Sequence, residues 1–271
     1  MTTPQQDFFN TFGFLAIGQI FSADEVEIIS REFDDVMLED RQGKPFAGRQ
    51  RQTVSDWFRR RLAVEFLIDD ERIREPVEAL LGPGYSFLKG NDGNFYVGDT
   101  EWHPDLGWDP AIPEGRMDPY RKAGNLTNHY VPSIKAAFYL DPVGRESGCL
   151  RVIPGSHRSP LHEQLWSLHL DIPARAAKLP HVHAKLLEMW ERDSGDPDGG
   201  EGLLVDPKVN HFGLEPRDVP SFAIESQPGD VVFFSHQLWH ASFGGRSGRR
   251  MFTLNYRIAE AEVAKQIAEE S

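Results

Sequence analysis

Hydrophobic residues in the first eighty positions recur with the spacing of helices. Residues 22–25 form a capping-box pattern, and the apolar residues after it are three or four positions apart: Val26, Ile29, Phe33 and Val36. This spacing places all four on one face of a helix. We therefore predict an amphipathic helix over residues 23–39. A second helix is predicted over residues 70–81, where Gly82-Pro83-Gly84 ends it.

From residue 86 onward the pattern changes to short apolar segments, rich in β-branched and aromatic residues, between turn residues. The predicted strands are residues 86–88, 95–97, 134–140, 150–153, 221–224, 231–234 and 251–255. Helices followed by many short strands favour a β-sandwich or jelly roll supported by N-terminal helices. The fold is therefore expected to be mainly β with flanking helices, in a single domain over residues 1–271.

Residues 160–215 do not follow the strand pattern. They contain two longer apolar stretches, residues 161–170 and 181–190, and then a polar loop rich in aspartate and glycine. An insertion of this size in a compact domain is more often functional than not. We interpret it as a lid or a substrate-selecting element.

Composition narrows the classes of function. The chain has no apolar run of the roughly 20 residues that a membrane-spanning helix needs. Its first residues lack a basic region followed by an apolar stretch, and its one cysteine, Cys149, excludes an internal disulfide, so a cytoplasmic location is expected. A net charge of −13 argues against nucleic-acid binding. The basic residues between Lys44 and Arg61 form either a solvated face or a gate for an anionic substrate.

Two His-x-Asp triplets occur, His103-Pro-Asp105 and His169-Leu-Asp171. Positions i and i+2 share one side of an extended segment but not one face of a helix. His169 lies in a leucine-rich stretch that is predicted to be helical, whereas His103 follows a predicted strand. His103 and Asp105 are therefore the better candidates for a pair of metal ligands.

A third ligand has to come from a distant strand. Pro228-Gly229-Asp230 is a turn signal, and residues 231–234 form a run that is apolar on both faces, as in a buried strand. Its continuation carries His236 and His240, which spacing alone does not separate. The downstream residues favour His240, because Ser242, a glycine-rich turn and Arg249 follow it. Two histidines and one carboxylate form the facial triad of non-haem iron(II) oxygenases, which keeps coordination positions open.

Arg249 is suited to a co-substrate that chelates iron at one end and carries a carboxylate at the other. A guanidinium binds a carboxylate through two parallel hydrogen bonds, and the Ser242 hydroxyl could add a third. Arg249 and Arg250 face opposite sides of their strand. The Arg250 side continues with Phe252 and Leu254, which is typical of packing against helices. Arg249 is therefore preferred.

Several motifs appear in an order that resembles the phytanoyl-CoA dioxygenase family of iron(II)/2-oxoglutarate oxygenases, which also resembles ectoine hydroxylase. The motifs are Trp102-His-Pro-Asp105, Ala137-Phe-Tyr-Leu-Asp-Pro142, Glu146-Ser-Gly-Cys-Leu-Arg-Val-Ile-Pro-Gly-Ser-His157, Pro228-Gly-Asp230, His240-Ala-Ser242, and Arg249 seven residues before Tyr256. The resemblance covers most of residues 8–257. Where this family usually has His-Gly-Ser, the chain has His-Ala-Ser.

This resemblance implies a double-stranded β-helix (jelly-roll, cupin-like) core. It also implies iron(II) bound by His103, Asp105 and His240, with 2-oxoglutarate bound by Arg249 and Ser242. The expected reaction hydroxylates, or otherwise oxidises, a C–H bond of a small molecule with O2, and releases succinate and CO2. Related halogenases lack the carboxylate ligand, so Asp105 favours hydroxylation.

Several further residues are expected near the metal. Trp102, Trp108 and Tyr96 are predicted to face the substrate, although they could equally be core residues. His157 is expected to be structural. Four residues are open candidates for contact with 2-oxoglutarate: Asn91, Asp92, Asn94 and Lys135.

Two alternatives remain from the sequence. One is a cupin-like metal protein, such as a zinc isomerase or hydrolase, which has no use for Arg249. The other is a catalytically silent jelly-roll binding module, which the complete triad with its arginine disfavours.

Overall fold

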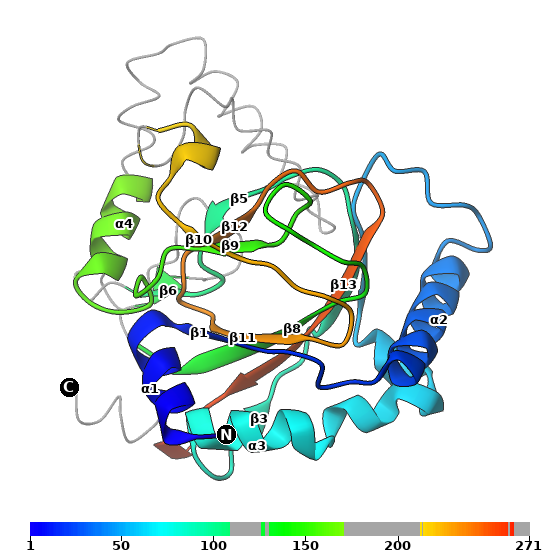
Figure 1. Ribbon diagram of the computed structural model, residues 1–271, viewed down its shortest axis with the longest axis horizontal. Helices are drawn as coiled ribbons and strands as arrows, with labels where there is room; N and C mark the ends of the chain where they lie inside the picture. Colours follow the sequence, from blue (N-terminus) through cyan, green and yellow to red (C-terminus); the bar gives the residue numbers. More distant parts are fainter. Residues whose placement is uncertain (109–125, 128–129, 171–211, 213, 260, 263–271) are drawn as a thin grey trace.

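Two antiparallel β-sheets with helices on their outer sides form the frame of the protein (Figure 1). The computed structural model describes residues 1–108, 126–127, 130–170, 212, 214–259 and 261–262. The large sheet has the order β1 (Phe14–Ile17), β11 (Val231–Ser235), β8 (Ser133–Tyr139), β13 (Arg249–Arg257), β4 (Asp92–Tyr96) and β2 (Gln52–Ser55), and β3 (Ser86–Phe87) also pairs with β13.

The small sheet has the order β10 (Phe222–Ile224), β9 (Leu150–Val152), β12 (His240–Ser242) and β5 (Thr100–His103). Two further strands, β6 (Gly107–Trp108) and β7 (Leu126–Thr127), form a separate parallel pair. All seven predicted strands are present within one to three residues of their expected bounds. The prediction of a mainly β fold with flanking helices is confirmed.

Four α-helices and three short 3-10 helices complete the described part of the chain. They are α1 (Thr3–Phe12), α2 (Ala23–Asp40), α3 (Glu71–Leu81), α4 (Leu161–Leu170), η1 (Trp57–Arg60), η2 (Leu62–Ile68) and η3 (Pro216–Asp218). Helix α2 begins with the expected capping box, in which the Glu25 amide donates to Ser22 Oγ and the Ser22 amide donates to Glu25 Oε2. Helix α1 was not predicted, although Thr2 and Gln5 form a second capping box before it.

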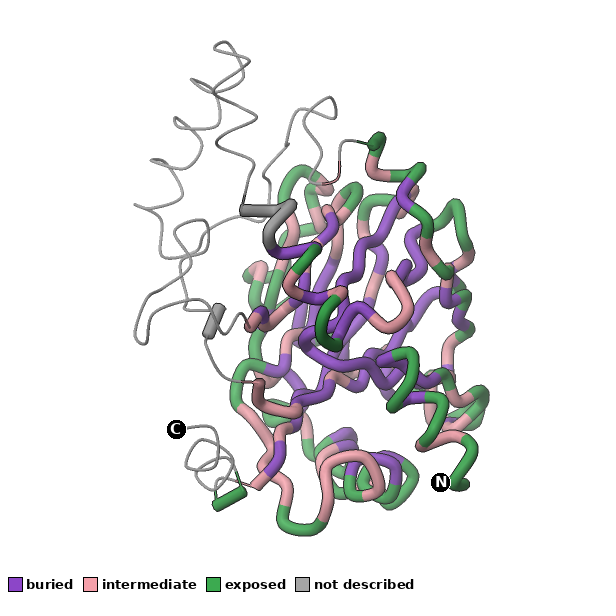
Figure 2. The backbone as a smooth tube through the Cα atoms, turned by 90° about the vertical axis from the view of Figure 1, so that its left-hand side faces the viewer, coloured by how far each residue is buried: buried purple, intermediate pink, exposed green. Residues whose placement is uncertain are grey.

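Three apolar clusters hold these layers together. The first packs the outer face of the large sheet against α2, α3, η1 and η2, with Phe33, Trp57 and Phe252 near its centre. The second lies between the two sheets and contains Phe234 from the large sheet and Val152 from the small one. The third covers the outer face of the small sheet beneath α4. Figure 2 shows buried residues gathered in the interior of the molecule and exposed residues mainly at its edges.

One strand boundary differs from the prediction and affects the site. The apolar strand β11 ends at Ser235, and residues 236–239 turn the chain out of the large sheet and into the small one. In this turn the amides of Gln237 and Leu238 donate to Ser235 Oγ and to the Ser235 carbonyl. His240 therefore does not continue the apolar strand but begins a new one, β12, in the other sheet.

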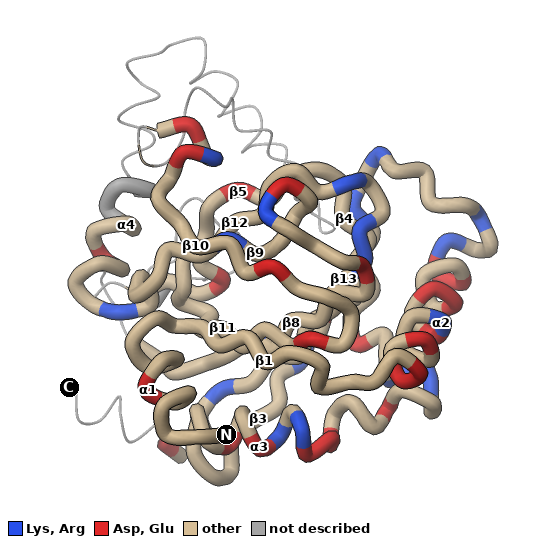
Figure 3. Tube along the Cα trace, viewed as in Figure 1, with Lys and Arg blue, Asp and Glu red and all other residues tan. Residues whose placement is uncertain are grey.

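The charged residues lie mainly on the helices and loops (Figure 3). The basic residues after α2 are spaced along the connection to β2 and η1. Arg61 pairs with Glu32 and Glu39 of α2, and Arg51 lies over the ring of Tyr96. Among the helices of the described ranges, none combines the length and the apolar character that crossing a bilayer requires.

Candidate metal centre

His103 and His240 meet across two paired strands of the small sheet. His103 is the last residue of β5, His240 is the first of β12, and the two are directly opposite in the antiparallel register. Their rings are 4.3 Å apart between centroids. A backbone register, rather than a flexible loop, thus fixes the separation of the two imidazoles.

Asp105 joins them from the segment just after β5. Its Oδ1 lies 2.9 Å from the Lys135 ammonium, and its Oδ2 lies 3.8 Å from His240 Nε2. Oδ2 is buried and has no hydrogen-bond donor among the described residues. The ligand atoms of His103, Asp105 and His240 all lie within 4.8 Å of one another. A buried carboxylate oxygen without a partner is costly, and a cation at this point would remove that cost.

Backbone carbonyls orient both imidazoles. Nδ1 of His103 lies 2.6 Å from the Glu101 carbonyl, and Nδ1 of His240 lies 2.8 Å from the Leu238 carbonyl. A carbonyl only accepts, so each Nδ1 carries the proton and each Nε2 carries the lone pair. This is the usual outer-sphere arrangement of metal-binding histidines. Two imidazole nitrogens and one carboxylate oxygen around one point fit an iron(II) ion with open positions.

Electrostatics keep the Asp105 carboxylate ionised. Burial alone would raise its pKa, but the positive charge of Lys135 holds the pKa well below its ordinary value. The carboxylate is therefore available as an anionic ligand at neutral pH.

His236, the alternative third ligand, is not part of this group. It lies in the turn before β12, where its amide donates to the Ser133 carbonyl and its own carbonyl accepts from Leu106. Burial lowers the pKa of its imidazole to about 4, so it is neutral. His169 lies in α4, as expected from its leucine-rich surroundings.

Arg249 is also buried, and it contacts β12 at Ser242, two residues beyond His240. It opens β13, is only 2% exposed, and donates through Nη1 to Ser242 Oγ at 2.8 Å and to the Gly148 carbonyl. Its guanidinium lies 5.0 Å from the ring centre of Tyr96, and its Nε is buried with no hydrogen-bond partner in the described part of the chain. A buried guanidinium with an unpaired N–H is suited to receive an anion.

Arg250 faces the opposite side of the strand. Its guanidinium donates to Asp34 of α2 and to Asp141 beyond β8. The strand continues with Phe252 and Leu254 in the cluster beneath the helices. The structure thus brings Arg249 and Ser242 together inside the protein and places Arg250 on its helix-facing side.

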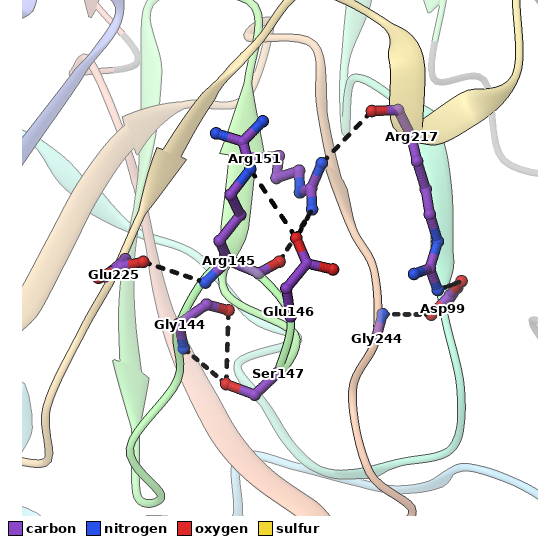
Figure 4. Close-up of polar contacts among 9 residues, drawn as sticks. All are labelled: Asp99, Gly144, Arg145, Glu146, Ser147, Arg151, Arg217, Glu225 and Gly244. Carbon is purple, nitrogen blue, oxygen red and sulfur yellow. Dashed lines mark hydrogen bonds and ion pairs between the residues drawn. The ribbon is translucent and has the colours of Figure 1, made fainter.

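Two loops enclose Arg249, residues 144–148 and residues 244–248. Figure 4 shows the polar contacts that fix them. Asp99 accepts from the Gly244 amide at 2.6 Å and from Arg217 at 2.9 Å, and the buried Arg151 donates to the Arg145 carbonyl at 2.9 Å. A Cβ atom added at Gly148 or Gly245 would overlap the Arg249 guanidinium. Both glycines are therefore required by the close approach of Arg249.

The three aromatic residues expected at the substrate have different places. Tyr96 lies beside Arg249, and the guanidinium groups of Arg249 and Arg51 both lie over its ring. Trp108 stacks on His162 of α4, which also accepts from its amide at 3.1 Å. Trp102 does not face the metal triad. It is buried in the third cluster, where its Nε1 donates to the Pro216 carbonyl.

Of the four open candidates, the structure brings only Lys135 to the triad. Asn91 accepts from the Asn255 amide at 2.6 Å, Asp92 accepts from Ser55 at 2.6 Å, and Asn94 accepts from Thr53 at 2.8 Å. These three contacts join neighbouring strands and loops. Lys135 differs from the other three candidates because it is a charge within the largely apolar strand β8.

Part of the expected substrate region lies outside the described residues. This applies to residues 109–125, which follow Trp108, and to residues 171–211 of the interpreted insertion. From the insertion, the structure describes residues 160–170, which include α4, and residues 212, 214 and 215.

Comparison with solved structures shows a shared fold. HygX from Streptomyces hygroscopicus, solved with nickel and 2-oxoglutarate bound, is 18% identical, with a TM-score of 0.60 over 96% of this chain and 88% of HygX. The non-haem α-ketoglutarate-dependent carbocyclase SnoK from nogalamycin biosynthesis is 17% identical, with a TM-score of 0.56 over 95% of this chain and 84% of SnoK. The epimerase SnoN from the same biosynthesis is 18% identical, with a TM-score of 0.56 over 94% and 82%.

Comparison of the sequence with family models identifies the chain more directly. No curated protein matches it significantly. The model described as phytanoyl-CoA dioxygenase (PhyH) matches residues 9–252, which include His103, Asp105, His240 and Arg249. The chain therefore belongs to the phytanoyl-CoA dioxygenase (PhyH) family of iron(II)- and 2-oxoglutarate-dependent oxygenases.

Proposed function

We propose that His103, Asp105 and His240 bind iron(II), and that Arg249 and Ser242 bind the far carboxylate of 2-oxoglutarate. The observation that carries this proposal is that β12 places His240 beside the other two metal ligands and Ser242 beside the buried Arg249. His240 and Ser242 share one face of β12 and lie two residues apart, roughly 7 Å along a strand. This span matches a five-carbon dicarboxylate that chelates the metal at one end and reaches Arg249 at the other.

Within this proposal, the paired sheets form a double-stranded β-helix core. Both sheets are antiparallel, and the second apolar cluster fills the space between them. The metal ligands come from the small sheet, and the carboxylate-binding arginine comes from the large one. Residues 160–215 act as the lid or substrate-selecting element. Helix α4, which contacts Trp108 through His162, is the described part of that element.

The reaction that we propose is hydroxylation of a C–H bond in a small molecule. When bound, iron(II) and 2-oxoglutarate supply oxidation of a C–H bond by O2, with release of succinate and CO2. Asp105 occupies the position that a halide would need, which favours hydroxylation. Phe234 lies 5.0 Å from the His240 ring and helps to exclude water from the metal side.

The same site supports a second outcome, desaturation or ring closure of the substrate. The similar structures include a carbocyclase and an epimerase, so one fold serves several reactions in those proteins. The resemblance to ectoine hydroxylase stays a prediction and names no substrate for this chain.

A binding experiment tests the proposed site. Iron(II) and then 2-oxoglutarate are added to the protein without oxygen, and the weak visible charge-transfer band of the chelate is titrated. We expect a band in the native protein and no band in Asp105→Ala. Arg249→Met should raise the Kd for 2-oxoglutarate about 100-fold, because a charge-assisted pair of hydrogen bonds is lost. Arg250→Met is the matched control, and a larger loss in that variant would contradict the assignment of Arg249.

A further inference from the structure

Asp141 belongs to the motif Ala137–Pro142, yet it makes no contact with the proposed metal ligands among the described residues. It follows strand β8, is 7% exposed, and directs both carboxylate oxygens to one segment, residues 246–250. Oδ1 accepts from Arg246 Nη2 at 2.9 Å and from Arg250 Nη2 at 3.1 Å. Oδ2 accepts from the Arg250 amide at 2.8 Å. One carboxylate thus holds the turn before β13 and the start of that strand.

The backbone explains why a side chain is needed here. Strand β8 pairs with β13 as far as Tyr139 opposite Met251, and the Leu140 amide then donates to the Arg250 carbonyl. Beyond this point β8 has ended, so no strand carbonyl is available to the Arg250 amide on that side. The Asp141 carboxylate takes the place of that carbonyl.

Arg249 is the residue next to this anchored amide and faces the opposite side of the strand. Its guanidinium has little freedom, because Gly148, Gly245, Ser242 and Tyr96 enclose it. A displacement of its Cα atom would move the guanidinium away from the position of the co-substrate carboxylate. Displacements of about 1 Å are enough to weaken a functional contact strongly.

We propose that Asp141 is a positioning residue for 2-oxoglutarate binding, which acts by anchoring the start of β13 so that Arg249 meets the far carboxylate of the co-substrate. This inference rests on the proposed role of Arg249. It assigns to Asp141 no contact with the metal, the co-substrate or the substrate.

Asp34 provides a matched control. It accepts from Nη1 of the same Arg250 guanidinium at 2.8 Å, but it contacts neither the Arg250 amide nor Arg246. Removal of the Asp34 charge therefore removes one ion pair of Arg250 and leaves the anchored backbone intact.

The experiment compares two 2-oxo acids in the same anaerobic charge-transfer titration. 2-Oxoglutarate carries the far carboxylate, and 2-oxobutanoate chelates iron(II) in the same way without it. We expect Asp141→Asn to raise the Kd for 2-oxoglutarate about tenfold or more while the Kd for 2-oxobutanoate changes less than about twofold. Asp34→Asn should leave both constants within about twofold of the native protein.

Two results would overturn the inference: an unchanged Kd for 2-oxoglutarate in Asp141→Asn, or an equal loss for both 2-oxo acids. If the native protein itself does not prefer 2-oxoglutarate over 2-oxobutanoate, the assignment of Arg249 fails, and the inference fails with it.

Circular dichroism checks the fold of each variant. Should Asp141→Asn not fold, Arg246→Met decides the matter, because this exposed side chain is one of the two guanidinium partners of Asp141. It should weaken 2-oxoglutarate binding selectively by about threefold, and no selective loss would overturn the inference.

Discussion

The two oxygens of Asp105 have different surroundings, and this difference defines the metal position at the scale of a single residue. Lys135 holds Oδ1, whereas Oδ2 is buried beside His240 without a donor among the described residues. A metal ion bound through Oδ2 would leave the contact between Lys135 and Oδ1 intact. Outer contacts of this kind orient a ligating carboxylate. Lys135 therefore favours coordination of iron through one oxygen of Asp105.

The choice between His236 and His240 gives a prediction at the same scale. His236→Gln should bind iron(II) with a Kd within about threefold of the native value, since His236 is outside the ligand group. His240→Gln should raise the Kd for iron(II) 100-fold or more, which is roughly the effect of removing a metal ligand or its direct support. Anaerobic iron(II) titration with a competing chelator measures both constants. Equal losses in the two variants would mean that the triad is assigned wrongly.

At the scale of elements, the loops around Arg249 depend on glycine. Gly148 has φ +89°, and a Cβ there would overlap the Arg249 guanidinium. Gly148→Ala should therefore raise the Kd for 2-oxoglutarate at least about tenfold. Gly155 is the matched control, because it has φ +79° but its Cβ would lie 3.6 Å from the nearest atom. Gly155→Ala should lose stability, by about 1 kcal/mol, without a change in that Kd. The same chelate titration and a chemical denaturation series separate the two effects.

The N-termini of α2 and α3 are joined by one guanidinium. Arg72 donates to Glu25, which caps α2, and to Asp70, which caps α3. Hydrogen bonds from Arg72 and the Ser22 backbone lower the pKa of Glu25 from 4.5 to about 2. Because this pKa is depressed on folding, the stability it confers is complete above pH 4.5 and is lost as the pH falls toward 2.

Arg72→Met should therefore lower the free energy of unfolding at pH 7 by about 1 kcal/mol, since the pair is partly exposed. The variant should also lose less stability than the native protein between pH 4.5 and 2. Urea denaturation at several pH values provides the measurement. Arg31→Met is the control, because Arg31 is exposed and the adjacent Glu32 is the partner in its ion pair and its side-chain hydrogen bond. A parallel pH profile for Arg72→Met and the native protein would contradict the predicted coupling.

The sequence predicted those parts of the fold and the site that follow from local periodicity. Helical spacing located α2, the stop signal Gly82-Pro83-Gly84 marked the end of α3, and alternation along an extended segment put His103 and Asp105 on one side. The same alternation turns Trp102 to the opposite side, into the third cluster, as expected from the alternative that it is a core residue. The contacts of Lys135 with Asp105 and of Asp141 with Arg250 join separate strands. No local pattern contains them, because they depend on the order of strands in the sheet.

At the scale of the whole molecule, the proposed site spans two layers. His103 and His240 belong to the small sheet, whereas Arg249 and Lys135 belong to the large one. Iron alone would join β5, β12 and the segment of Asp105. Iron with 2-oxoglutarate would also connect the small sheet to the first residue of β13. The co-substrate would thus add a non-covalent link between sheets that already meet through apolar packing and through the hydrogen bond from Arg249 to Ser242.

This link predicts how ligands change thermal stability. A ligand that binds only the folded state at 100 times its Kd stabilises by about 2.7 kcal/mol, which corresponds to a rise in Tm of about 5–10 °C for a chain of this size. We expect 2-oxoglutarate to give such a rise only when iron(II) is present, because the chelate needs the metal. In Arg249→Met the increment from 2-oxoglutarate should fall to that of 2-oxobutanoate, while the increment from iron alone persists. Differential scanning calorimetry without oxygen measures these increments. A full 2-oxoglutarate increment in Arg249→Met would place the far carboxylate elsewhere and break the proposed link between the sheets.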